Sequence, residues 1–308
     1  MNQRFKFGIY LPTLSDYCHF TELSSSHYLD IIKFIQNGDN DRLAEILDSV
    51  VSELTDNIDI LPLLTRIDIF CILLNLRIIC IGSKIELKLR CPKTKKTFNV
   101  PVDLYDILDS VTNYNIEYTN TISVAERCHV SLCIPRTLAS RADEDIILSC
   151  IDTITLYDKA YNTSEYTVNE KEEILDRLPG NILTKIVEHI TSSHAKYNVH
   201  AIKYRSPHDQ MSEPVTYDLQ LYNNSFFEFI KTIYNANLEE QYYMRYILSH
   251  RMGFDLPYVE SRTPAELDTY IGFYKQELED QKKEQEKNNS GNQVPPGPTL
   301  PQQPGFPS

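Results

Sequence analysis

The sequence has no tryptophan, and its nine glycines do not gather into a nucleotide-binding motif. Neither GxxxxGKS/T nor GxGxxG occurs, and a phosphate-binding loop needs closely spaced glycines for its backbone to approach the phosphates. No stretch approaches the roughly 18 uninterrupted apolar residues of a membrane-spanning helix. The longest apolar run, residues 67–81, is interrupted by Asp68, Asn75 and Arg77. The N-terminus lacks the apolar core of a signal peptide. We therefore expect no nucleotide-binding site, membrane span or secretion signal.

Basic residues are outnumbered in the sequence. Thirty Lys and Arg stand against 43 Asp and Glu, which gives a formal net charge of −13. An acidic surface repels phosphate backbones, so nucleic acid is not an expected ligand. The charge instead fits a partner-binding protein that it keeps soluble.

The seven cysteines lack the spacing of a disulfide framework or of a zinc site. Their number is odd, none forms a CxxC pair, and several lie in apolar segments, which favours reduced, buried thiols. Cys128, His129 and Cys133 are neighbours, but in a strand His129 points to the face opposite Cys128. The turn at 91–94 has the outline of a zinc knuckle with a threonine in place of the second thiolate, and one soft ligand does not hold zinc. No GxSxG motif occurs, and the histidines are scattered. We therefore predict no catalytic residue, metal or cofactor.

Apolar residues spaced three and four apart predict helices at 27–36, over 43–54 and from Thr65 to the glycine at 82. Asp39 or Asn40 can cap the second of these helices. Thr65 and Asp68 form the pattern of a capping box at the start of the third helix. That helix is apolar nearly all round, so we expect it at the centre of the core. Residues 263–266 likewise combine an N-cap threonine, a proline at the first helical position and a glutamate at the third.

Further side chains belong to these and other expected helices. The buried face of the helix from 263 should carry Leu267, Tyr270, Ile271, Tyr274 and Leu278. A helical stripe is expected at Ile146, Ile147, Cys150, Ile151 and Ile154, and two more helices at 174–178 and 182–190.

Alternation with a period of two predicts strands. A short strand is expected at 7–12 and another at 130–134, which Pro135 should end. Two β-hairpins are expected, at 84–102 and 199–221. Pro101 cannot donate a backbone hydrogen bond, which suggests that the first hairpin contains an edge strand.

Together these patterns predict an α+β protein, predominantly helical, in which two small β-hairpins pack with amphipathic helices and a C-terminal tail is disordered. Six of the 16 prolines fall after Val294, and such a tail buries too little apolar surface to offset its ordering entropy. The expected organisation is an N-terminal α+β domain at 1–125 with hairpin 84–102, a helical domain at 126–224 with hairpin 199–221, an aromatic-rich helical segment at 225–284 and a disordered, proline-rich tail at 285–308.

Aromatic and basic side chains supply the candidate partner-binding residues. The chain has 20 tyrosines and 12 phenylalanines, and a helical core does not easily cover both faces of an aromatic pair, so we expect another chain to cover the rest. One basic turn on an acidic protein offers a site for an acidic partner. The residues are Phe226, Phe227, Tyr234, Tyr242, Tyr243, Tyr246, Lys93, Lys95 and Lys96. Packing of the aromatic side chains within the chain's own core remains an open alternative.

The order of segments resembles that of a known family. The sequence reads IYLP at 9–12, LPLLTRID at 61–68, LLNLR at 73–77, IELKLRCP at 85–92 and FNVPVDL at 98–104. IDTI at 151–154, EEILDRL at 172–178 and the pair at 226–227 follow in the same layout. Across roughly residues 5–235, this set resembles the small baseplate hub family of T-even-type contractile-tailed bacteriophages.

The resemblance implies a non-enzymatic phage baseplate hub protein, either a structural subunit or an assembly factor. Its partners would be other hub or tail proteins, with the tape-measure protein among the candidates. It would act in the host bacterial cytoplasm during assembly and in the virion tail baseplate. The family typically places paired cysteines in its hairpins, whereas only Cys91 stands there in this sequence. Two alternatives remain open: a tail-assembly chaperone for the tape-measure protein that is absent from the mature virion, and an unrecognised enzyme. Oligomeric state is not predicted.

Overall fold

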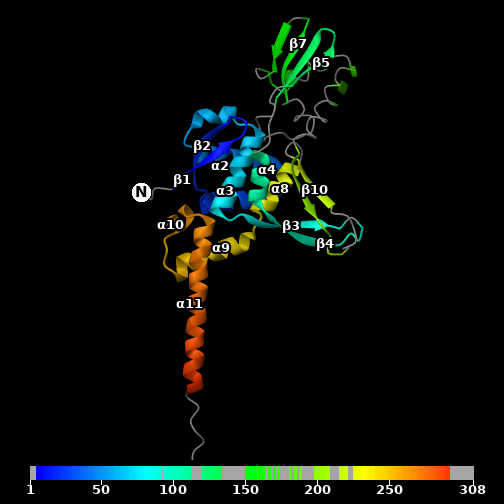
Figure 1. Ribbon diagram of the computed structural model, residues 1–308. Helices are drawn as coiled ribbons and strands as arrows, with labels where there is room; N and C mark the ends of the chain where they lie inside the picture. The colour runs from blue at the N-terminus through cyan, green and yellow to red at the C-terminus, as the bar shows by residue number, and fades with distance from the viewer. Residues whose placement is uncertain are drawn as a thin grey trace, which may run out of the picture.

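The computed structural model of the chain has an α+β fold that is predominantly helical, which confirms the predicted fold class (Figure 1). The structure describes residues 5–291 except for 92, 113–119, 134–149, 158, 164–165, 168, most of 171–197, 209–214 and 221–224.

The N-terminal hairpin is followed by two helices. Strands β1 (Lys6–Leu11) and β2 (Asp16–Thr21) pair antiparallel, and helices α1 (Ser25–Asn37) and α2 (Asn40–Leu54) come next. Gly38, in the left-handed conformation with φ 74°, ends α1. Asp39 then caps α2 by accepting hydrogen bonds from the backbone N–H groups of Asp41 and Arg42. The predicted strand and both helices are confirmed, whereas β2 was not predicted.

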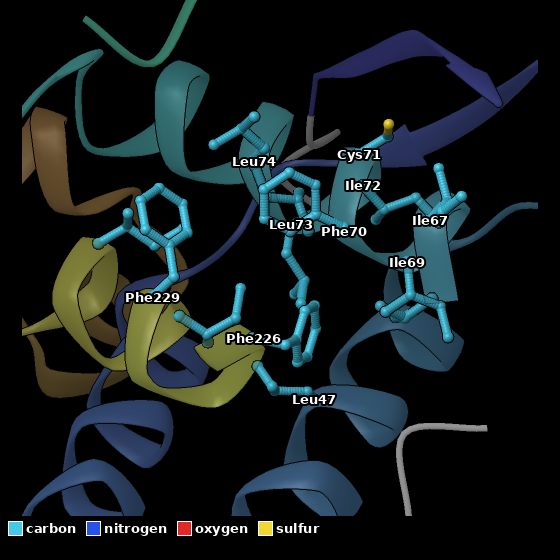
Figure 2. Close-up of a cluster of buried hydrophobic side chains, with 14 of the residues drawn as sticks. Leu47, Ile67, Ile69, Phe70, Cys71, Ile72, Leu73, Leu74, Phe226 and Phe229 are labelled. Atoms are coloured by element: carbon cyan, nitrogen blue, oxygen red, sulfur yellow. The ribbon is translucent and has the colours of Figure 1, made fainter. Parts of the chain in front are cut away.

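Helix α3 (Arg66–Cys80) lies at the centre of the core, as predicted, after the short 3₁₀ helix η1 (Ile58–Leu63). The capping box of Thr65 and Asp68 is present. The Asp68 carboxylate also accepts a hydrogen bond from the backbone N–H of Thr13, at 3.0 Å, and from the Thr13 hydroxyl. Figure 2 shows the side chains of α3 gathered with Leu47 of α2 and with two phenylalanines of the later helix α8 (Ser225–Tyr234).

Both predicted hairpins are confirmed. Strand β3 (Lys84–Arg90) pairs with β4 (Thr97–Asp103), and β9 (Asn198–Tyr204) pairs with β10 (Val215–Gln220), each pair forming a two-stranded antiparallel sheet. Pro101 therefore stands on an edge strand, opposite Glu86. Helix α4 (Leu104–Thr112) follows the first hairpin directly and contacts β9, so the two hairpins lie close together.

A four-stranded antiparallel sheet stands at one end of the molecule (Figure 1). Its strands in order are β5 (Asn120–Ala125), β6 (Cys128–Leu132), β7 (Ile151–Leu156) and β8 (Lys159–Asn162). The short strand predicted at 130–134 is thus confirmed through Leu132, and Ile134 and Pro135 lie outside the described residues.

The helical stripe expected at 146–154 is wrong for its three described members, because Cys150 lies in a turn and Ile151 and Ile154 belong to β7. Ile151 pairs with Leu132 and Thr153 with Ser131, so Asp152 is an extra residue in the ladder. This bulge places two isoleucines three positions apart on the same buried face, which imitates helical spacing. Ile146 and Ile147 lie outside the described residues. So do the apolar residues of the helices predicted at 174–178 and 182–190, although described neighbours such as Glu173, Asp176 and Lys185 are helical.

The C-terminal helices form a small second cluster around Met244, Leu248, Val259 and Leu267. They are α9 (Leu238–Tyr246), the π-helix η4 (Ile247–Arg251), α10 (Leu256–Ser261) and α11 (Pro264–Gly291). The capping arrangement predicted at 263–266 is confirmed, because Thr263 and Glu266 exchange hydrogen bonds.

Helix α11 departs from the sequence prediction in two ways. Leu278, assigned to its buried face, is 39% exposed. The helix also continues to Gly291, so the prediction of disorder is wrong for 285–291, while 292–308 lie outside the described residues. The charged stretch from Gln281 is rich in glutamine, lysine and glutamate. These residues favour a helix, although they bury little apolar surface. Over the described ranges, no helix combines the length and apolarity that a membrane crossing requires.

Candidate interaction surfaces

The aromatic residues of α8 are part of the core, which corrects the prediction for three of the candidate residues. Phe226, Phe227 and Tyr234 are all less than 5% exposed. The ring of Phe226 lies 6.1 Å from that of Phe70 on α3 (Figure 2). The buried hydroxyl of Tyr234 donates a hydrogen bond to the carbonyl of Leu73 at 2.6 Å. These side chains stabilise the packing of α8 on α3 and do not line an exposed surface.

The tyrosines of α9 are exposed, as expected for a partner-binding surface. Tyr242, Tyr243 and Tyr246 are 49%, 64% and 47% exposed. The rings of Tyr243 and Tyr246 are stacked, with centroids 6.4 Å apart, and His250 continues the row 4.7 Å from Tyr246. We call these four residues the tyrosine ridge. Three neighbouring exposed tyrosines combine apolar ring area with hydroxyl groups, which is the side-chain chemistry enriched at protein interfaces.

The helix that carries the ridge is held firmly. Asn237 caps α9 by accepting hydrogen bonds from the N–H groups of Glu239 and Glu240. The guanidinium of Arg245 donates to the carbonyl and the hydroxyl of Ser25, at 2.5 and 2.9 Å, at the start of α1. A ridge fixed in this way loses little conformational entropy when a partner binds.

A second aromatic group joins α10 to α11. The ring of Phe254 lies 5.4 Å from Tyr258 and 5.3 Å from Tyr270. The guanidinium of Arg262 lies 4.2 Å from the centre of the Tyr258 ring, a cation–π contact. This packing, together with buried Leu267, fixes the direction in which α11 leaves the body.

The basic turn lies at the exposed tip of the first hairpin. Lys93, Lys95 and Lys96 are all exposed. Lys95 has φ 59°, a left-handed conformation that closes the turn, and its N–H donates to the carbonyl of Cys91 at 2.9 Å. Whether the three lysines bind a partner remains a proposal.

Beneath that turn, Cys91 connects the two hairpins. Its side chain is buried, and its sulfur accepts a hydrogen bond from the N–H of Thr94 at 3.4 Å. Hydrogen bonds from the side chains of Ser206 and Thr94 lower the pKa of the Cys91 thiol from 9.0 to about 7, because they favour the thiolate. The ring of Phe98 lies 5.6 Å from that of Tyr204 across the same junction.

The hairpin junction holds the contact that sequence reasoning missed. The turns at 91–96 and 205–208 are more than a hundred residues apart, so no local pattern relates them. Helix α4, which follows the first hairpin, packs against β9 of the second hairpin, and this packing brings Ser206 close to Cys91. Among the described residues, no three His, Cys, Asp or Glu side chains come together as metal ligands.

An open groove of about 530 Å³ lies between β3 and α8. Of its charged side chains, Lys231 and Glu228 pair with one another at 2.9 Å. Arg77 donates from Nε to the carbonyl of Ile233 at 2.5 Å. The residues that line the groove include no cysteine, serine or histidine.

Comparison with known proteins identifies the family. Residues 9–236 match the family described as T4 bacteriophage base plate protein, and this range is well over half of the chain. The chain therefore belongs to the T4-type bacteriophage baseplate protein family. No curated protein and no solved structure matches it. The match ends between α8 and α9, so the core and both hairpins lie within it, whereas the tyrosine ridge and α11 lie beyond it.

Proposed function

We propose that this protein is a baseplate hub protein of a contractile-tailed bacteriophage and acts by protein–protein interaction, as a structural subunit or an assembly factor. Membership of the baseplate family supports a role in the tail. The narrower assignment to the hub is supported by the segment order of residues 5–235, which resembles the hub family. The protein would act in the host cytoplasm during assembly and in the baseplate of the virion.

A single structural observation supports the proposal that the protein acts by binding other proteins. The tyrosine ridge exposes three neighbouring rings on a helix that the Arg245–Ser25 hydrogen bonds hold in place. Exposed aromatic groups of this kind are favoured where another protein covers them. The proposed partners are other hub or tail proteins, with the tape-measure protein among them. The lysines of the first hairpin tip add a basic contact for an acidic segment of such a partner.

A non-enzymatic role is part of the proposal. Structural proteins of the baseplate need no catalytic group, and the groove between β3 and α8 supplies no cysteine, serine or histidine. The pKa of the thiols at Cys71, Cys80 and Cys150 is raised by burial, which makes them poor nucleophiles. Cys91, the thiol with a lowered pKa, is itself buried.

The test is a pull-down of tail proteins from infected cells with a tagged chain carrying Tyr242→Ser, Tyr243→Ser and Tyr246→Ser. We expect loss of the co-purifying hub or tail proteins, because a tyrosine at the centre of a binding hot spot contributes about 2 kcal/mol. Tyr105→Ser is the matched control, since Tyr105 is 52% exposed on α4 away from the ridge. Undiminished capture by the triple variant would contradict the role of the ridge.

Mass spectrometry of purified virions separates the two modes of action. A structural subunit remains in the particle, and an assembly factor or chaperone does not. A chain that captures no tail protein at all, in any form, would refute the proposed function.

A further inference from the structure

Most of α11 projects away from the rest of the molecule (Figure 1). Only its first turns are held, by buried Leu267 and by half-buried Tyr270 and Ile271. From residue 275 to residue 287 every side chain is exposed. The projecting part, residues 272–291, extends for about 30 Å at 1.5 Å per residue. An isolated helix of this length is marginal in water, so a packed partner is expected to stabilise it.

The projecting helix has an apolar seam, and Phe273, which is 63% exposed, lies outside it. Tyr274 and Leu278 are followed by Gln281 and Gln285, with the alternating spacing of four and three residues that defines the a and d positions of a coiled coil. Ile271 stands earlier in the same row but already packs against the second cluster. The other faces of residues 275–287 are mostly charged or amide side chains. The seam is therefore the face that another helix would cover.

The charges that flank the seam determine which helix fits. With Leu278 at position a, Lys275 and Lys282 occupy position e, while Glu277 and Glu284 occupy position g. In a parallel pair of identical helices, position g of one chain faces the following e position of the other, so Glu277 meets Lys282 twice by symmetry. An antiparallel pair would instead bring glutamate to glutamate and lysine to lysine.

We infer that α11 pairs with α11 of a second copy of this chain, as a parallel two-stranded coiled coil built on residues 274–285. The seam covers fewer than two heptads, against the three to four of a stable isolated coiled coil. Pairing is therefore weak and reversible in dilute solution, and trapping it covalently is the appropriate test. The inference does not depend on the proposed function, because it rests on the seam and its flanking charges alone.

The first experiment places a cysteine in the seam of the full-length chain. In a parallel pair the two d positions face each other, so Gln281→Cys forms a disulfide between copies under mild oxidation. The control is Gln276→Cys, at position f on the outer face of the same helix. We expect at least several-fold more disulfide-linked dimer from Gln281→Cys than from Gln276→Cys or the unmodified chain. Equal yields would overturn the inference.

The second experiment tests the charge pairs in the Gln281→Cys background. Glu277→Lys puts lysine against lysine, and Lys282→Glu puts glutamate against glutamate, so each variant alone should lose cross-linking. An equimolar mixture of the two restores both opposite-charge pairs and should recover a mixed disulfide. Cross-linking that ignores these changes, or a mixture that stays monomeric, would overturn the parallel arrangement. Circular dichroism of each variant checks that the helix is retained.

Discussion

The hydroxyl of Tyr234 donates a hydrogen bond to the carbonyl of Leu73 across 2.6 Å, and thereby ties helix α8 to the middle of helix α3. Both residues lie within the range that matches the baseplate family, and burial of the ring raises the pKa of Tyr234 well above its ordinary value. The raised pKa keeps the hydroxyl protonated at neutral pH, so it remains a hydrogen-bond donor.

Tyr234→Phe keeps the ring and removes only this hydroxyl. The loss of one buried hydrogen bond should lower the free energy of unfolding by about 1 kcal/mol. Urea denaturation measures it, with Tyr105→Phe as the control because Tyr105 is exposed. No difference between the two variants would mean that the hydroxyl contributes nothing to the packing of α8 on α3.

Asp68 and Asp39 both cap helices, yet their surroundings differ. The buried Asp68 carboxylate accepts hydrogen bonds from the N–H of Thr65 at 2.9 Å, from the Thr65 hydroxyl at 2.8 Å and from the Thr13 N–H at 3.0 Å. Asp68→Ala leaves these donors unpaired in the core and should cost about 3 kcal/mol or more. Asp39→Ala removes a surface cap and should cost about 1 kcal/mol. Urea denaturation of both variants measures the loss in free energy of unfolding. Equal losses would contradict the stronger contribution assigned to Asp68.

Ser206 is the first cause of the lowered pKa at Cys91. Ser206→Ala removes that hydrogen bond to the thiolate, so the pKa of Cys91 should rise from about 7 toward its ordinary value of 9.0. The absorbance of the thiolate during a pH titration reports the change. Ser49→Ala is the control, since Ser49 donates to Glu53 on α2 and touches no thiol. An unchanged titration would mean that the two turns do not meet as the structure has them.

The same contact makes stability depend on pH. A thiol with a pKa lowered on folding binds its proton less tightly in the folded state than in the unfolded state, so the folded state gains stability as pH rises from about 7 to 9.0. That stabilisation is lost as pH falls through about 7. Ser206→Ala should flatten this part of the curve, which thermal unfolding at several pH values measures.

Local interactions explain what the sequence could predict. The capping boxes that begin at Thr65 and Thr263 and the alternation of Ile85, Leu87 and Leu89 involve residues a few positions apart, so their patterns are visible without the fold. The central helix, both hairpins and the family resemblance followed from such patterns.

Features that depend on tertiary interactions could not be predicted from the sequence. The bulge at Asp152 gives Ile151 and Ile154 a helical spacing inside a strand, and only pairing with β6 reveals it. The contact of Cys91 with Ser206 needs two distant turns to meet. The aromatic pairs at 226–227 and 242–243 have the same composition, but the first lies against α3 and the second faces outward, because α8 and α9 pack against different neighbours.

That difference between the two aromatic pairs gives the last prediction. The ring of Phe226 is fully buried, lies 6.1 Å from Phe70 and 5.2 Å from Phe227, and carries the Arg66 guanidinium 5.7 Å from its centre. Phe226→Ala should therefore leave a cavity and cost about 3–5 kcal/mol. Tyr243→Ala, at an exposed ring, should change stability by less than about 0.5 kcal/mol.

The two variants should also differ in how they affect the binding of tail proteins. Tyr243→Ala should fold normally yet weaken the capture of tail proteins, whereas Phe226→Ala should weaken capture only in proportion to the unfolded fraction. Denaturation curves and pull-downs of the same preparations measure both. If Phe226→Ala kept its stability while Tyr243→Ala unfolded, the assignment of α8 to the core and α9 to the surface would be reversed.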